Sequence, residues 1–205
     1  MRLLIPKHFL SLGGIACSRK AAELGNRKIA IVENGSLGGT CVNVGCVPKK
    51  VMWNAANLMA NLADMEAYGI CVPRSCLNWG TLKAARDAYV AKLNAIYNTN
   101  LKASGVDLFC GKAQFIGPHS VAVCGTGLTL HAEHIVIATG GRPIVPSDVP
   151  GAHLGKTSDG FFKISALPKS VVIAGAGYIA VELAGILAAM GCQVTMVLRH
   201  KLVLR

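Results

Sequence analysis

The chain has 205 residues, of which 52% are hydrophobic and 23 are glycine, a composition typical of a buried sheet packed between helices and joined by tight turns. The formal net charge is +11, but the basic residues are scattered and no aromatic-basic stripe accompanies them, so we expect anionic small ligands and no nucleic-acid partner. No apolar run reaches the ~18 residues of a membrane-spanning helix, so we expect no membrane insertion.

The first 22 residues contain no acidic side chain and include four basic residues, a pattern that resembles a weak mitochondrial presequence. The same run continues into Ala21–Gly25, which is typical of a helix that ends at a glycine, so we favour an unusual start of the fold over a cleaved signal. Eight cysteines without a small secreted framework indicate a reducing compartment. We therefore expect a cytoplasmic protein, with the mitochondrion as the alternative.

A dinucleotide-binding pattern opens the chain. A strand is expected over residues 1–8, a helix begins near Gly14, and residues 28–33 form a second strand that ends in Glu33, placed for a ribose hydroxyl. The fingerprint is degenerate, because Phe9 and Ser11 stand where its first two glycines belong and only Gly14 holds the third position. We therefore expect weak pyrophosphate binding at this site.

Two cysteines follow in the motif GGTCVNVGCVPKK. Cys41 and Cys46 come after a Gly-Gly-Thr turn and before a helix predicted from Lys49 to about Met65, where the helix dipole favours the thiolate. Positions five apart in a regular helix lie roughly 8–9 Å apart, beyond the ~4.4–6.8 Å of a disulfide, so a bridge requires a distorted first turn. Gly45 relaxes the backbone and Pro48 is predicted as the first helical residue. A strained, exposed bridge of this kind is labile and catalytic.

Other interpretations of the two cysteines stay open. Taken alone, a C-x4-C pair is more often a pair of ordinary buried thiols. A zinc site is disfavoured because no second Cys/His pair has metal-ligand spacing, so we predict no metal. Cys71 and Cys76 repeat the spacing without a glycine-rich turn or a following helix-start pattern, and we interpret that pair as incidental.

The middle of the chain reads as one long helix and several short strands. The helix is predicted over residues 82–102, with apolar side chains at spacings of three and four: Tyr89, Leu93, Ile96, Tyr97 and Leu101. We interpret the aromatic residues among them as core residues rather than site residues. Residues 106–138 alternate short strands with glycine turns and end in a strand, 135–138, that we expect to be buried. Prolines at 143, 146 and 150 indicate a linker.

A second dinucleotide fingerprint lies beyond the linker. A buried strand over 171–174, the G-x-G-x-x-A run starting at Gly175, a helix over 181–190 and a strand over 194–198 occur in the order that the motif requires. Basic residues replace the usual acid after the last strand, which favours a 2′-phosphate over a 2′-hydroxyl; they are Arg199, His200 and Arg205. The alternative is a solvated basic end.

With these motifs in place, the chain from about Gly13 to Arg205 resembles the FAD-dependent pyridine nucleotide disulfide oxidoreductases. The motif GGTCVNVGCVPKK is shared by the glutathione, trypanothione and large thioredoxin reductases of that family. Four further stretches are similar to the glutathione reductase group: KKVMW, RDAYVAKLNAIY, TSDGFF and GAGYIAVELAG.

The resemblance implies that electrons pass from NADPH to FAD, to the Cys41–Cys46 disulfide and then to glutathione disulfide. Cys41 is implied to attack the substrate, and Cys46 to be the charge-transfer thiol beside the flavin. Lys49 is implied to pair with Glu182 next to the flavin. The ordinary alternatives are a helix-start cation for Lys49 and a solvated helix acid for Glu182.

The remaining site residues are carried over by position. Tyr178 is implied to cover the nicotinamide pocket. The implied FAD contacts are Gly14, Glu33, Gly39, Thr40, Lys49, Thr139 and Gly140. The implied NADPH contacts are Gly175, Gly177, Tyr178, Ile179, Glu182, Arg199, His200 and Arg205. Arg19, Tyr97 and Asn100 are implied to line the glutathione site, although Tyr97 also suits the core.

We therefore predict an α/β fold with two Rossmann-like parts. Residues 1–146 are expected to form an FAD-binding domain with a β-meander, and residues 147–205 the start of an NADPH-binding domain. The C-terminal interface domain, through which the family forms homodimers, is expected to be missing, so activity of this chain alone is in doubt. The competing hypotheses are a non-catalytic truncated product and a thioredoxin or trypanothione reductase relative.

Overall fold

The computed structural model describes residues 2–5, 12–25, 28–71 and 76–204. The predictions that concern Phe9, Ser11 and Arg205 lie outside these residues. Two compact units are present, Met1–Val47 with Ala88–Thr157, and Pro48–Asp87 with Ser158–Arg205, and each is described on its own. Within the described residues, every helix is too short or too polar to cross a membrane.

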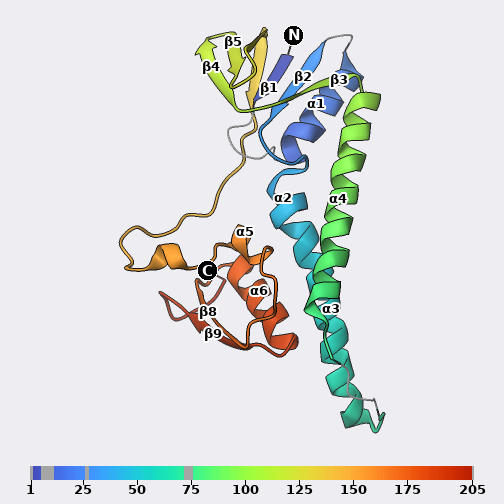
Figure 1. Ribbon diagram of the computed structural model, residues 1–205, viewed down its shortest axis with the longest axis vertical. Coiled ribbons are helices and arrows are strands. Elements are labelled where there is room, and N and C mark those ends of the chain that lie inside the picture. Colours follow the sequence, from blue (N-terminus) through green and yellow to red (C-terminus); the bar gives the residue numbers. More distant parts are fainter. Residues whose placement is uncertain (1, 6–11, 26–27, 72–75, 205) are drawn as a thin grey trace. The chain divides into compact units, whose positions relative to one another are not determined.

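The first unit is built on a parallel sheet of four strands. These are β1 (Arg2–Ile5), β2 (Ile29–Glu33), β3 (Val106–Cys110) and β7 (His134–Ile137), hydrogen-bonded in the order β3-β2-β1-β7 (Figure 1). All three pairings are parallel, with Leu3 of β1 opposite both Ala30 and Ile135. The parallel order and the intervening helix confirm the Rossmann-like α/β fold predicted for this region.

Strand β2 is the centre of this unit, because all five of its residues are buried. On one face, Ile29 and Ile31 join a cluster with Ile15 of helix α1 (Leu12–Leu24) and Leu101 of helix α4 (Trp79–Ala103). On the other face, Ala30 and Val32 pack in a second cluster with residues that follow β3. Burial on both faces explains why the strand is a continuous apolar run.

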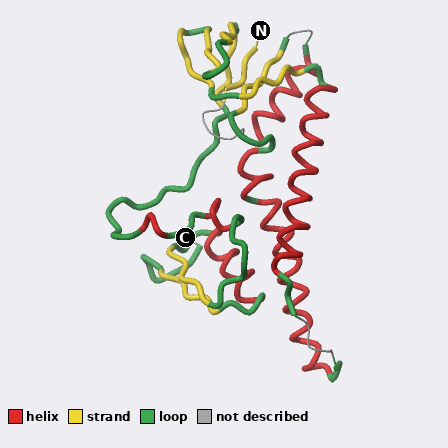
Figure 2. Tube along the Cα trace, viewed as in Figure 1, coloured by secondary structure: helices red, strands yellow, loops and turns green. Residues whose placement is uncertain are grey.

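The second cluster is supplied by an antiparallel meander of three strands. These are β4 (Ala113–Gly117), β5 (Ser120–Val123) and β6 (Leu128–His131), seen as short yellow segments beside the sheet in Figure 2. Val121, Val123 and Leu130 face β2 and are buried. The strands and glycine turns predicted for residues 106–138 are confirmed.

Two burial predictions for the first unit are wrong. The strand β7 was expected to be buried, but Ile137 is 65% exposed because β7 lies at the edge of the sheet that the structure describes. Tyr89 of α4 is expected in the core, but it is 46% exposed, whereas Leu101 on the same helix is fully buried. Helical spacing predicted which face of α4 is apolar, but it did not predict how much of that face is buried.

The second unit contains a β-α-β arrangement. Strand β8 (Ser170–Ala174) is followed by helix α6 (Tyr178–Ala189) and strand β9 (Gln193–Val197), and the two strands pair in parallel with Val172 opposite Thr195. This is the second dinucleotide-binding unit that the sequence predicted, although α6 begins three residues earlier than expected. The predicted burial of β8 is wrong: its residues alternate between exposed and partly buried, because only one face of this two-stranded sheet packs against α6.

The rest of this unit consists of helix ends and short turns. Helix α3 (Cys46–Met65) is followed by the 3₁₀ turn η1 (Glu66–Tyr68), and the short helix α5 (Ser158–Phe161) precedes β8. The segment that we predicted as a linker has neither helix nor strand over residues 141–150, and a 3₁₀ turn, η2 (Ala152–Leu154), follows it. Helix α4 begins only three residues after Cys76, and the Asn78 side chain caps it by accepting a hydrogen bond from the Thr81 N–H at 2.9 Å. The prediction that no helix start follows Cys76 is therefore wrong.

A buried arginine holds this unit together. Arg86 is 1% exposed and lies over the Phe162 ring, and its Nη2 donates at 2.6 Å to both the Phe162 carbonyl and Asp87 Oδ1. Trp79 Nε1 adds a bond of 3.0 Å to the Ile164 carbonyl. Burial alone would raise the pKa of Asp87, but the hydrogen bonds and charges of Lys83 and Arg86 outweigh it and lower the pKa.

Candidate functional site

The cysteine motif folds as two helices separated by one glycine. Cys41 lies in the short helix α2 (Gly39–Val44), and Cys46 is the first residue of α3. Helix α3 therefore begins three residues before the predicted start at Lys49, and Pro48 is its third residue rather than its first, which corrects both expectations. The local break predicted from disulfide geometry is present, at Gly45.

Close backbone approach explains why position 45 is glycine. A Cβ atom at Gly45 would lie 2.8 Å from the Thr40 carbonyl oxygen and 3.2 Å from the Cα of Cys41. Gly38, with φ +103°, is equally restricted, since a Cβ there would meet the Val42 side chain at 2.6 Å. The two thiols are thus presented by a chain that folds back on itself, with Cys41 partly buried and Cys46 exposed. A bond between them stays a prediction.

Sequence reasoning missed two asparagines that hold this loop. Asn43 lies on α2 between the two cysteines, and its Nδ2 donates to the carbonyl oxygens of Gly39 and Leu37 at 2.9 and 3.1 Å. Asn94 on α4 donates from its Nδ2 to the same Leu37 carbonyl at 2.6 Å and to Asn43 Oδ1 at 3.1 Å. Both asparagines lie inside quoted motifs, but their spacing of 51 positions gives no local signal of a contact.

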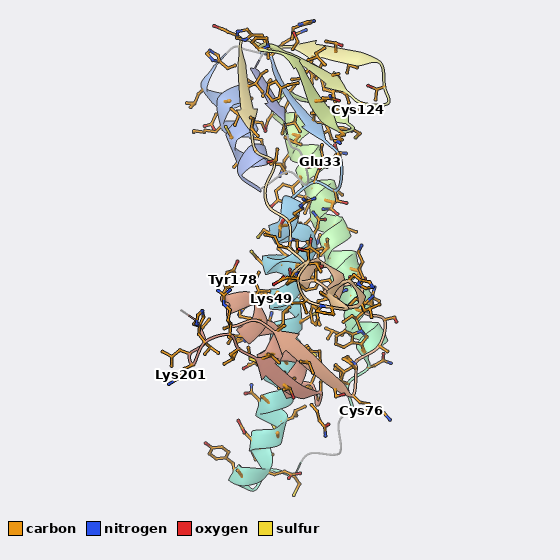
Figure 3. All side chains as sticks on the ribbon, turned by 90° about the vertical axis from the view of Figure 1, so that its left-hand side faces the viewer. Glu33, Lys49, Cys76, Cys124, Tyr178 and Lys201 are labelled. Carbon is orange, nitrogen blue, oxygen red and sulfur yellow. The ribbon has the colours of Figure 1, made fainter. Side chains whose placement is uncertain are left out.

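Lys49 and Glu182 meet as predicted. Lys49 Nζ lies 2.8 Å from Glu182 Oε1, and both side chains are partly buried, so neither is a simple solvated charge. Tyr178, one turn before Glu182 on α6, is 68% exposed and is labelled near Lys49 in Figure 3. The pairing is confirmed, while the catalytic role of the pair stays a prediction. The neighbouring Lys50 instead stacks over the Trp53 ring, 3.4 Å from its centroid.

The turn before α6 fits a dinucleotide pyrophosphate. Gly175 has φ +143°, a conformation that side-chain-bearing residues rarely adopt, and a Cβ added at Gly177 would meet no atom within 4 Å. Gly177 caps α6 without a side-chain hydrogen bond, so the N-cap residue satisfies none of the first-turn N–H groups, including that of Ile179, at the positive end of the helix. A phosphate group would fit these donors.

The basic residues beyond β9 lie together. Arg199 Nε donates to His200 Nε2 at 3.3 Å, and both residues line one cavity with Lys201, which sequence reasoning did not single out although it belongs to the same basic run. The third predicted residue, Arg205, lies outside the described residues. Two cations and an imidazole in one concave surface suit an anionic group such as a 2′-phosphate.

Predicted FAD contacts gather at the carboxyl edge of the first sheet. Glu33, at the end of β2 in Figure 3, is 2% exposed and accepts from the Gly35 N–H at 2.8 Å. Thr139 and Gly140 come one residue after the end of β7, which runs parallel in the same sheet, and Gly140 has φ +67°. Gly14 is buried in the first turn of α1, while Gly39 and Thr40 open α2. Nucleotides bind at this edge of parallel sheets, so the described residues fit the cofactor.

The three predicted substrate residues are in one unit but differ in their surroundings. Arg19 is exposed, and its Nε donates to Ser104 Oγ at 3.2 Å. Asn100 is partly exposed on α4. Tyr97 packs against the cluster around Ile15, which supports the alternative that it belongs to the core. Their role in substrate binding stays a prediction. The described residues contain no group of acids, histidines and cysteines suited to a metal.

Comparison with known proteins gives one consistent picture. Residues 11–205 match the family described as pyridine nucleotide-disulphide oxidoreductase. The chain is 49% identical over 201 residues to a glutathione reductase of Schizosaccharomyces pombe, covering 94% of this chain and 43% of that protein. It is 44% identical over 205 residues to a glutathione reductase of Yarrowia lipolytica, with the same shares covered.

A solved structure is also similar. The HOCl-induced flavoprotein disulfide reductase RclA from Escherichia coli matches with a TM-score of 0.79 and 28% identity, covering 96% of this chain and 41% of that chain. The chain thus spans less than half the length of the relatives that it matches.

Proposed function

Because the chain belongs to the pyridine nucleotide-disulphide oxidoreductase family, we propose that it supplies the redox centre of a glutathione-disulfide reductase that uses NADPH and FAD. The observation that carries this proposal is the placement of Cys41 and Cys46 on the two sides of the Gly45 break. Identities of 49% and 44% to glutathione reductases support the choice of substrate within the family.

The proposed cofactor contacts follow from the two nucleotide-binding turns. Glu33, Gly14 and the turn at Gly140 would hold FAD, and Gly175, Gly177 and the cavity at Arg199 would hold NADPH. FAD, when bound, would supply the two-electron transfer between the nicotinamide and the protein disulfide. The Lys49 ammonium, oriented by Glu182, would keep a positive charge where negative charge develops during reduction.

The thiol chemistry needs both cysteines. After two electrons and two protons convert the disulfide to two thiols, the Cys41 thiolate attacks one sulfur of glutathione disulfide and releases one glutathione. Cys46 then attacks Cys41 Sγ in the mixed disulfide, which releases the second glutathione and closes the Cys41–Cys46 bond again. The substrate is reduced by two electrons and the protein returns to its oxidised state.

The first test is a visible spectrum of the purified protein loaded with FAD, before and after NADPH. Flavin bands that bleach with NADPH, and that return when glutathione disulfide is added, are the expected result. In the Cys41→Ser variant, NADPH should still bleach the flavin bands, but glutathione disulfide should not restore them. A protein that takes up no flavin would favour the competing hypothesis of a non-catalytic product.

Two variants separate the reasons for weak flavin binding. Phe9→Gly and Ser11→Gly together restore the first fingerprint, and we expect them to raise flavin occupancy. Unchanged occupancy would show that the fingerprint does not limit binding.

Substrate choice is tested by supplying glutathione disulfide, oxidised thioredoxin and trypanothione disulfide in turn and following NADPH oxidation. Preference for glutathione disulfide is expected, and preference for either of the others would reassign the chain within its family. We propose homodimer assembly only for a protein that also carries the interface domain, and analytical ultracentrifugation of that protein tests it.

A further inference from the structure

Asn94 is a polar side chain that connects helix α4 to the cysteine loop. Its Nδ2 donates to the Leu37 carbonyl at 2.6 Å and to Asn43 Oδ1 at 3.1 Å. Asn43 in turn donates to the carbonyl oxygens of Leu37 and Gly39, at 3.1 and 2.9 Å. The Leu37 side chain packs against the buried cluster around Ile15. The hydrogen bonds of Asn43 and Asn94 therefore connect α2 to the backbone of Leu37, whose side chain packs in the core.

Helix α2 depends on such a tether. It has six residues, and isolated helices shorter than ~12–15 residues are marginal in water. Its N-cap residue, Gly38, provides no side-chain hydrogen bond, and the Val42 N–H reaches the Gly38 carbonyl only at 3.4 Å. The position of Cys41 on α2 is thus determined less by the helix itself than by the contacts of the loop that precedes it.

We propose that Asn94 is a positioning residue for the cysteine pair: by fixing the Leu37 carbonyl and the Asn43 side chain, it sets the thiol–disulfide equilibrium of Cys41 and Cys46. This inference rests on the proposed function, because it takes the two thiols to be a redox pair. Asn94 acts through the backbone that carries Cys41, by way of its hydrogen bonds to Leu37 and Asn43.

The direction of the effect follows from disulfide geometry. A disulfide tolerates a narrow range of Cα separations, so a scaffold that holds both cysteines near that range favours the bridge over two thiols. Loosening α2 lets Cys41 sample positions from which the bond cannot form. Loss of the Asn94 donor should therefore make the bridge easier to reduce.

The experiment is a redox titration of the full chain with dithiothreitol, followed by alkylation and mass spectrometry of the peptide that contains both cysteines. In this exchange the protein disulfide gains two electrons and two protons, while dithiothreitol closes its own ring disulfide. Asn94→Asp keeps the size of the side chain but replaces the donor with an acceptor facing two other acceptors. Asn94→Leu removes the donor without adding charge. In both variants we expect the equilibrium to shift toward the dithiol about tenfold, or about 30 mV for a two-electron couple.

Asn98→Asp is the matched control, because it adds the same charge one turn further along α4. A shift of the thiol–disulfide equilibrium in both Asn94 variants but not in the control supports the proposal. If both Asn94 variants titrate as the wild type does, the proposal is overturned. Circular dichroism shows whether each variant is folded. If one Asn94 variant is unfolded, the titration of the other decides the test. If both Asn94 variants are unfolded, Asn94 is required for folding and the proposal is wrong. A wild-type chain that forms no Cys41–Cys46 bridge at any ratio would overturn the proposed function as well.

Discussion

Lys49 on α3 and Glu182 on α6 form an ion pair of 2.8 Å although they are 133 positions apart in the sequence. The partners come from the two motifs of the chain that carry chemistry, the cysteine motif and the second dinucleotide fingerprint. Since both belong to the same compact unit, the pair is an internal contact of that unit.

The ion pair should contribute modestly to stability. A double-mutant cycle with Lys49→Met and Glu182→Gln, measured by thermal unfolding, is expected to give a coupling of about 0.5–1 kcal/mol, because both groups keep partial contact with water. The coupling should weaken at high salt. Lys50→Met is the control, since Lys50 stacks on Trp53 rather than pairing with Glu182, and it should show no coupling to Glu182→Gln. A coupling free energy of zero between Lys49 and Glu182 would show that the ion pair does not contribute to the stability of the folded state.

Asp87→Asn should destabilise the protein at neutral pH by about 1–2 kcal/mol, because Arg86 loses its charged partner while staying buried. The folded-state pKa of Asp87 is lowered, so its contribution is present above the unfolded value of 3.8 and is lost as pH falls through the folded-state value. The difference between wild type and variant should therefore shrink below about pH 4 in urea unfolding curves. A difference independent of pH would contradict this assignment.

Asp159→Asn is the matched control, and its expected effect on the stability of the folded state has the opposite sign. Burial raises the pKa of Asp159 against the smaller influence of Lys163, so its ionised form weakens the folded state as pH rises through that pKa. At neutral pH the substitution should leave stability unchanged or raise it. A loss comparable to that of Asp87→Asn would show that removing any carboxylate in this unit is harmful.

Gly45→Ala should disturb the cysteine loop, because the new methyl group would lie 2.8 Å from the Thr40 carbonyl oxygen and must displace backbone. We expect a loss of about 1–3 kcal/mol in chemical unfolding and a lower yield of the Cys41–Cys46 bridge in peptide mapping. Gly185→Ala, in the interior of α6 where a Cβ meets nothing within 4 Å, should be neutral or stabilising by up to about 1 kcal/mol. Equal effects of the two substitutions would contradict the steric explanation.

Nicotinamide binding should favour NADPH over NADH through the cavity at Arg199, which can make a charge-assisted bond to a 2′-phosphate. Titration by calorimetry is expected to show about tenfold weaker NADPH binding in Arg199→Ala with NADH binding unchanged, which corresponds to ~1.4 kcal/mol. Arg142→Ala, an exposed arginine outside this cavity, should bind both nucleotides as the wild type does. Parallel losses for both nucleotides would show that Arg199 does not recognise the 2′-phosphate.

The parts of this structure that could be predicted from sequence are those whose geometry is local. The turn at Gly175, the strand that ends in Glu33 and the cysteine motif each need particular residues at fixed spacing, and each lies where the spacing placed it. The Lys49–Glu182 pair was predicted through family resemblance alone.

Features that depend on distant neighbours were missed. The exposure of Ile137 depends on β7 having a partner on one side only among the described strands, and that of Val172 depends on which face of β8 is covered by α6. Asn94 finds Leu37 across 57 positions, and no periodicity signals such a contact. The start of α3 at Cys46 was missed because a proline was taken to mark the first helical residue, whereas it is tolerated anywhere in the first turn.

Burial of β2 on both faces has a consequence for how the chain is made. Its partner β3 begins only at Val106, and the meander that covers Val32 only at Ala113, after two long helices have been synthesised. At ~5–20 residues per second, a ribosome needs roughly 4 to 15 seconds to cover that interval. Throughout this time the apolar segment Ile29–Val32 has no β3 edge to join, so slower translation would lengthen the period in which this segment of the nascent chain is open to aggregation.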